Sequence, residues 1–225
     1  MDWRERLHSV VLSTIVRDFP EGFWADIRTG ARQAYLDVFH QVDADPNLVS
    51  EQRIDTLFQV RHFRMEHLLT KISLEHGIPC SATILAENNR HYVYSTKGDI
   101  ALTQVYVPAI GAMPKPARFR ERLAAINDIM RSPRLDLGDE PREVLLGKRF
   151  YGLLAHNPAG KRFVESDQRL GMIQFCLPVK DCSDWAMQLT IEEIAAAYKS
   201  EAPSKKPDRR LPWKKRDDEE KGEEK

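Results

Sequence analysis

The sequence contains little cysteine, no excess of either charge and no long hydrophobic run. Its three cysteines, Cys80, Cys176 and Cys182, are too few and too unevenly spaced for a disulfide framework. Lys plus Arg number 34, as do Asp plus Glu, so no overall field favours nucleic acid or a membrane. No apolar stretch approaches the roughly 20 residues of a membrane helix, and the charged N-terminus does not resemble a signal peptide. We therefore expect a soluble, cytoplasmic protein with no membrane partner.

The common catalytic motifs are also missing from the sequence. It has no GxSxG, no GxxxxGK[ST], no GxGxxG after a strand and no CxxC. Two histidines and a glutamate in the segment HFRMEH resemble a zinc-binding helix, but His62 and His67 are five residues apart. A helix turns such a pair about 140° away from each other, whereas zinc ligands need a spacing of three or four. We predict no metal and no cofactor.

Hydrophobic periodicity predicts three helices in the first 78 residues. The first ends near Phe19, the second spans about 22–40 and the third covers 50–76. Each is followed by proline or glycine. The third is apolar on two sides, because Val60, Phe63 and Leu74 lie opposite its main stripe, and we expect it to pack on two sides.

From residue 79 the pattern changes to short β-type runs. Segments 81–87, 90–95 and 100–108 alternate in hydrophobicity and are joined by turn-forming residues, which predicts three antiparallel strands. This pairing puts Ile84, Val93 and Ile100 on the core face, with His91 opposite Gln104. This polar pair is explained by a mutual hydrogen bond at the sheet margin, or by a pocket in which His91, Gln104 and His156 contact a ligand or partner. Runs 150–156 and 171–179 extend the sheet. Further helices are predicted over 117–130 and from about Trp185 to near Ser200.

These elements together predict an α+β fold. An N-terminal helical layer packs on a mainly antiparallel sheet of about five strands, and residues 1–202 form one domain with a helical part, 1–78, and a sheet-containing part, 79–202. Residues 203–225 have no apolar periodicity; seven basic and one acidic residue in 205–216 precede two basic and six acidic residues in 217–225. This composition predicts a disordered, basic-then-acidic tail.

Basic residues supply the candidate binding sites. The repeated tetrapeptide GKRF at 147–150 and 160–163 would bring two basic dipeptides together if the run between them formed a hairpin, although solvated strand ends are the simpler interpretation. In the tail, basic clusters surround Trp213. This pattern is typical of segments that bind nucleic acid, of nuclear-import signals, and of tails that only solubilise a protein. The candidate binding residues are Lys148, Arg149, Lys161, Arg162, Lys205, Lys206, Arg209, Arg210, Trp213, Lys214, Lys215 and Arg216.

Four dispersed residues are the candidate catalytic groups: Arg61, His62, Glu66 and His91. Arg61 falls near the middle of the apolar stripe of the third helix. It must therefore either bind a carboxylate or strand-end carbonyls, extend its head past the apolar rim, or contact an anion.

The absence of a recognisable active-site set favours a non-catalytic regulatory or adaptor module that acts through contacts with a protein partner. One alternative is a nucleic-acid-associated factor, encoded on a mobile element, that uses the basic tail and patch. Another is a hydrolase or transferase with a dispersed active site.

Overall fold

The computed structural model describes residues 3–85, 91–130 and 149–201. The helices are α1 (Trp3–Asp18), α2 (Glu21–Asp43), α3 (Ser50–Glu75), α4 (Arg118–Ala124), the 3-10 helix η1 (Ala125–Met130), α6 (Glu165–Gln168) and α7 (Ile191–Glu201). The strands are β1 (Cys80–Ile84), β2 (His91–Lys97), β3 (Ile100–Tyr106), β4 (Phe150–Pro158), β5 (Leu170–Pro178) and β6 (Trp185–Thr190). No helix within these ranges combines the length and apolarity that a bilayer crossing requires.

All six strands form one sheet in the order β1-β2-β3-β4-β5-β6. Neighbouring strands are antiparallel except β3 and β4, which are parallel. A parallel pair needs a crossover connection, and the chain between β3 and β4 carries α4 and η1. The predicted α+β class is confirmed, with six strands where the sequence suggested about five.

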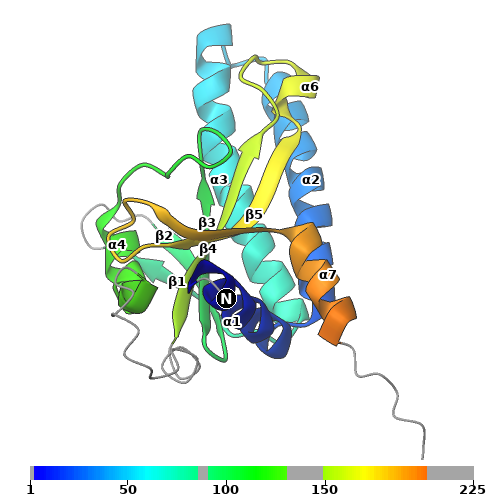
Figure 1. Ribbon diagram of the computed structural model, residues 1–225. Helices are drawn as coiled ribbons and strands as arrows, with labels where there is room; N and C mark the ends of the chain where they lie inside the picture. Colours follow the sequence, from blue (N-terminus) through cyan, green and yellow to red (C-terminus); the bar gives the residue numbers. More distant parts are fainter. Residues whose placement is uncertain (1–2, 86–90, 131–148, 202–225) are drawn as a thin grey trace, which may run out of the picture.

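The two faces of the sheet have different covers. Helices α1, α2, α3 and α7 lie on one face and bury alternate strand residues such as Leu102, Leu154 and Phe175 in the main core (Figure 1). A smaller cluster, which includes Tyr151 and Ala124, lies on the other face under α4. Whether the side chain of a strand residue faces the four helices or α4 therefore depends on its position in this alternation.

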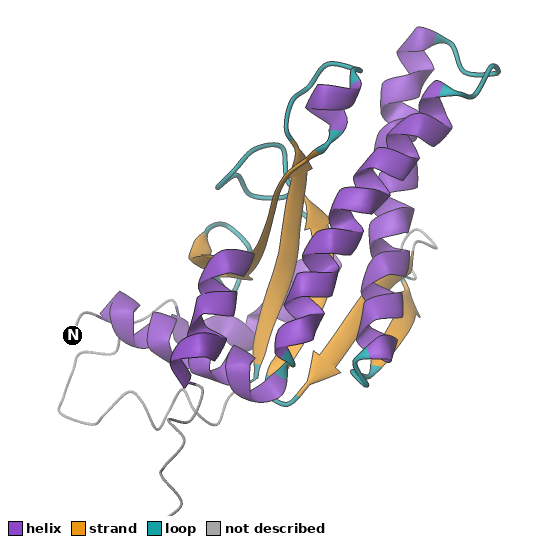
Figure 2. Cartoon of the chain, turned by 90° about the vertical axis from the view of Figure 1, so that its right-hand side faces the viewer, coloured by secondary structure: helices purple, strands orange, loops and turns teal. Residues whose placement is uncertain are grey.

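Helices α2 and α3 form a long antiparallel hairpin along the sheet (Figure 2). Helix α3 contacts α2 as well as β2 and β3, so it packs on two sides. The expectation that its second apolar side is also covered is wrong for Phe63 and Leu74, which are 67% and 62% exposed. The side of α3 that contacts α2 adjoins the side that contacts β2 and β3, so the remaining side of the helix is exposed to solvent.

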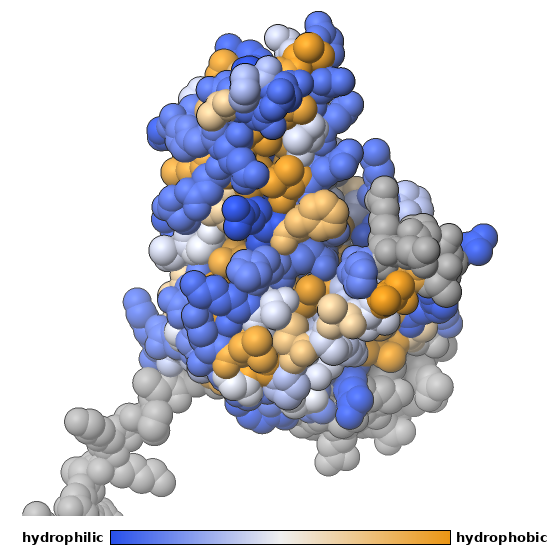
Figure 3. All heavy atoms as spheres, turned by 180° about the vertical axis from the view of Figure 1, so that it is seen from behind, coloured by the Kyte–Doolittle hydropathy of each residue, from blue (hydrophilic) through white to orange (hydrophobic). Residues whose placement is uncertain are grey.

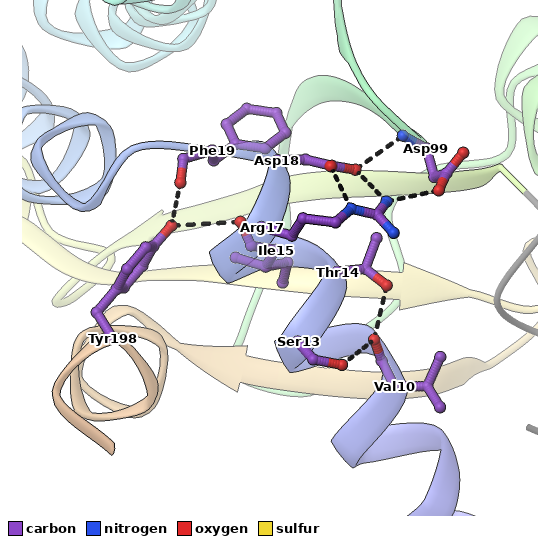
Figure 4. Close-up of polar contacts among 9 residues, drawn as sticks. All are labelled: Val10, Ser13, Thr14, Ile15, Arg17, Asp18, Phe19, Asp99 and Tyr198. Atoms are coloured by element: carbon purple, nitrogen blue, oxygen red, sulfur yellow. Dashed lines mark hydrogen bonds and ion pairs between the residues drawn. The ribbon is translucent and has the colours of Figure 1, made fainter. Parts of the chain in front are cut away.

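One end of the sheet is closed by contacts of α1 (Figure 4). Asp18 accepts a hydrogen bond from the backbone amide of Asp99 at 2.8 Å, while Arg17 pairs with both carboxylates. The turn between β2 and β3 uses Gly98 with φ +55°, and an added Cβ there would lie 2.2 Å from Asp18. The Tyr198 hydroxyl of α7 donates to the Phe19 carbonyl at 2.6 Å. Glycine is therefore required at this turn both for its conformation and for the close approach of α1.

The sequence prediction for the last helix is wrong in its first part. Trp185 and Leu189 belong to strand β6, and α7 begins only at Ile191. Met187 and Leu189 are buried while their neighbours are less so, which is the two-residue alternation of a strand. The spacing of four between Trp185 and Leu189 fits a strand as well as a helix.

Two predictions for the first hairpin strands need correction. Ile84 and His91 pair with each other at an exposed end of the sheet, with Ile84 60% exposed, so they are not core residues. His91 does not face Gln104, because the β2–β3 ladder runs only from Ser95 with Leu102 to Lys97 with Ile100. The predicted turn at residues 88–89 and the tail, 203–225, lie outside the described residues.

Candidate functional site

Strands β2 and β3 diverge beyond Ser95, and a glutamate side chain from α3 occupies the opening. Glu66 accepts a hydrogen bond from the backbone amide of Val93 on β2. It also accepts one from Gln104 Nε2 on β3, at 3.1 Å. Glu66 is 9% exposed, and it replaces the ladder hydrogen bonds that the two strands do not make with each other.

A buried relay of side chains holds Gln104 in place. Gln104 Oε1 lies 2.8 Å from His156 Nε2, and His156 Nδ1 lies 2.6 Å from the Tyr35 hydroxyl. Because an amide oxygen only accepts, His156 Nε2 carries the proton and Nδ1 accepts from Tyr35. The amide group of Gln104 then points at Glu66 and at His62 Nδ1, 3.0 Å away. Each buried group in this relay has a partner of the opposite hydrogen-bonding type.

Burial sets the protonation of the two ends of this network. Desolvation raises the pKa of Glu66 to about 7, against the smaller opposing effects of the Gln104 and Val93 hydrogen bonds. Desolvation lowers the pKa of His156 to about 3, with a further contribution from Arg61, so this imidazole is neutral. The site therefore combines a carboxyl group, Glu66, that titrates near neutral pH with an imidazole, His156, that stays neutral there.

The relay ends at a cleft of about 970 Å³ between α3, the diverging strands and residues 115–120. Two aromatic pairs line it. Phe58 and Tyr106 have ring centroids 5.1 Å apart, and Tyr92 stacks on Phe119 at 4.5 Å with an interplanar angle of 26°. Seen from behind (Figure 3), apolar side chains on this side of the molecule are scattered among polar ones and form no single continuous patch. The cleft has the size and mixed lining of a small-molecule site.

Three cationic side chains line the outer wall of the cleft, Lys115, Arg118 and Arg120. Lys115 and Arg118 are exposed, and none of the three forms an ion pair with a carboxylate in the described part of the chain. Arg120 donates to the Lys115 carbonyl and lies over the Phe119 ring, with 5.1 Å to its centroid. Partial burial lowers the pKa of Arg120. These three side chains make the outer wall of the cleft electropositive.

The structure brings together three of the four predicted catalytic candidates. Helical spacing of four places Phe58, His62 and Glu66 on the same side of α3, and all three line the cleft with His91 from β2. Arg61 does not line the cleft and is buried on the side of α3 that faces Tyr35. It donates to the carbonyl of Gln168, the last residue of helix α6, where the sequence predicted a carboxylate or a strand-end carbonyl.

Sequence reasoning missed the cations and aromatics of the cleft wall as site residues. The cations and Phe119 come from a loop and the short helix α4, which return to β2 after β3, and one sequence does not display this contact. Gln104 gives the best available signal, because it is a polar residue in the middle of an apolar strand.

The basic candidates do not gather into one patch. Residues 150–158 form the single strand β4, so Arg149 lies at its beginning and Lys161 and Arg162 lie beyond its end. Arg162 forms an ion pair with Asp167 at 3.0 Å. The hairpin on which the predicted patch depended is therefore not formed. Lys148, Lys205, Lys206, Arg209, Arg210, Trp213, Lys214, Lys215 and Arg216 lie outside the described residues.

Comparison with known proteins returns no match to a protein-family model, a curated protein or a solved structure. Within residues 3–85, 91–130 and 149–201, no group of three or more His, Cys, Asp or Glu residues is placed to hold a metal ion. The functional interpretation therefore rests on the geometry of the cleft.

Proposed function

We propose that the folded body is a regulatory module that binds a small planar organic anion, of the size of a mononucleotide, in the cleft. The observation that carries this proposal is the wall formed by Lys115, Arg118 and Arg120, three cations without a carboxylate partner in the described ranges. Arginine and lysine at a concave aromatic surface are the usual donors to phosphate or carboxylate groups.

The remaining walls of the cleft suit the rest of such a ligand. The Tyr92–Phe119 stack and the Phe58–Tyr106 pair offer ring faces for a planar group. Glu66, on the floor, offers a hydrogen-bond acceptor when it is ionised and a donor when it is protonated. The ligand class therefore follows from three separate features: charge, aromatic surface and a polar floor.

A thermal-shift experiment with three probes separates the contribution of the ligand's charge from the contribution of its planar ring. Inorganic phosphate carries the charge alone, a nucleoside carries the ring alone, and a nucleoside monophosphate carries both. We expect the monophosphate, at about 100-fold over its dissociation constant, to raise the Tm of the full-length protein by about 5 °C or more. Phosphate and nucleoside alone should raise it by less than half as much.

Charge reversal locates the binding. Arg118→Glu should remove the shift caused by the monophosphate, and Lys161→Glu, the same charge change outside the cleft, should retain it. A monophosphate shift that survives Arg118→Glu and disappears in Lys161→Glu would move the site to the end of β4. The absence of a shift with every probe would contradict the proposal.

General acid–base catalysis is a second candidate function, because Glu66 titrates near neutral pH beside His62 at the floor of the cleft. If the bound monophosphate is turned over, Glu66→Gln should abolish turnover and change the dissociation constant by no more than about twofold. Equal losses in binding and turnover would assign Glu66 to ligand binding alone.

Contacts with a protein partner and binding of nucleic acid through the tail stay predictions. Co-purification of the full chain and of a version that ends at Ala202, at low and high salt, tests both. A protein partner retained at high salt supports the first, and nucleic acid lost with salt or with the tail supports the second.

A further inference from the structure

Helix α3 buries a cation whose guanidinium is mostly without partners. Arg61 is 1% exposed, and Nη2 alone has hydrogen-bond partners, the Gln168 carbonyl at 3.2 Å and Gln168 Oε1 at 3.1 Å. Nε and Nη1 are buried and have no partner among the described residues. The acceptors that the described part of the chain offers this guanidinium are therefore uncharged oxygens.

Within residues 3–85, 91–130 and 149–201, no carboxylate forms an ion pair with Arg61. Its guanidinium lies over the Tyr35 ring, 4.1 Å from the centroid, and the ionisable groups that act on its pKa are Tyr35 and Tyr106. The acids that flank Gln168 are engaged elsewhere, Asp167 with Arg162 and Glu165 with Arg169. Burial lowers the pKa of Arg61, but a guanidinium stays protonated at neutral pH. The core thus holds a positive charge for which the described residues supply no counter-ion.

We propose that Arg61 binds a small monovalent anion, of the size of chloride or bromide, through Nε and Nη1. An anion supplies both the missing acceptors and the missing charge, whereas a water molecule supplies only an acceptor. The anion is small because Arg61 is buried, with its Nε and Nη1 closed off from solvent, and monovalent because a single cation compensates it. This site is separate from the cleft, with the Phe58–Tyr106 ring pair on the cleft side.

The site predicts that chloride stabilises the folded protein specifically. The Tm of the full-length protein should be measured while chloride replaces gluconate, an anion too large for the site, at constant ionic strength. Wild-type protein should gain about 5 °C when chloride is about 100-fold over its dissociation constant, and above that constant the Tm should rise with the logarithm of the chloride concentration. Arg61→Met should show no dependence. Arg64→Met removes an exposed arginine one turn away on the same helix and should behave as wild type.

Two further measurements test the proposal independently of the folding of Arg61→Met. If Arg61→Met does not fold, crystals of wild-type protein grown with bromide should show an anomalous peak within hydrogen-bond distance of Arg61 Nε or Nη1. A water molecule at that position, or equal chloride dependence in Arg61→Met and wild type, overturns the proposal. Arg118→Glu should keep the chloride effect, so failure of the cleft proposal and failure of the Arg61 site give different results.

Discussion

The sheet opens at two places, and a side chain from another element fills each opening in a different way. Between β4 and β5, Asn127 of η1 accepts from the Tyr151 amide at 2.9 Å and donates to the carbonyls of Tyr151 and Pro178 at 2.9 and 2.8 Å. Between β2 and β3, Glu66 accepts from Val93 and Gln104 and offers the strands no donor when ionised.

The two side chains differ in chemistry and in their access to solvent. Asn127 is 1% exposed, does not titrate and completes the hydrogen bonds of both strands. Glu66 carries an ionisable group at the floor of a cleft. A neutral amide is enough to join two strands, so a carboxyl at the second opening needs another explanation. The proposed ligand site supplies one, because the acid costs stability that an amide would not.

Exchanging the amide for an acid at the first opening should have the largest effect. Asn127→Asp keeps the shape of the side chain but turns an ionised oxygen toward two carbonyls. We expect the free energy of unfolding at pH 7 to fall by about 3 kcal/mol or more, with partial recovery at low pH when the acid is protonated. Urea denaturation at pH 7 and 5 measures this. Gln41→Glu adds a charge at an exposed site on α2 and should cost less than about 0.5 kcal/mol; an equal loss in both variants would contradict the role of Asn127.

The reverse exchange, Glu66→Gln, should change the pH dependence of stability. The pKa of Glu66 rises from 4.5 in the unfolded chain to about 7 in the folded protein. Because the folded state binds the proton more tightly, this contribution is complete below about pH 4.5 and is lost as the pH rises through about 7. The loss amounts to at most about 3 kcal/mol.

Glu66→Gln should therefore be more stable than wild type at pH 8, with the difference shrinking toward pH 5. Urea denaturation across this range gives the difference directly. Glu75→Gln, at an exposed position near the end of the same helix, should keep the wild-type profile. A difference between Glu66→Gln and wild type that does not depend on pH would mean that Glu66 titrates normally.

The smallest expected effect on stability concerns the relay in which Tyr35 and His156 orient Gln104. The described residues form no such relay at Asn127, which contacts the strand backbone directly. Tyr35→Phe leaves His156 Nδ1 buried without a donor, and we expect a loss of about 1–3 kcal/mol in the free energy of unfolding. Tyr94→Phe, at a half-buried hydroxyl, should cost less than about 0.5 kcal/mol. Equal stability of Tyr35→Phe and wild type would show that this hydrogen bond contributes nothing.

The sequence predicted most elements of this fold, because helical and strand periodicities follow from which side chains are buried. It predicted β6 as helix, since Trp185 and Leu189 fit both periods over so short a segment. It correctly separated His62 from His67, and His62 lines the cleft while His67 is exposed elsewhere on α3. The cleft itself was not predictable, because it depends on where β2 and β3 diverge and on the return of residues 115–120.

The most direct test of the central claim is an NMR titration of the full-length protein with a nucleoside monophosphate. If the diverging strands form the ligand site, the largest amide shift changes should fall on Val93, Gln104 and residues 115–120, and Arg118→Glu should suppress them. Changes centred on Arg149, on residues 161–162 or on residues 205–216 would contradict this account and assign the binding to the basic segments instead.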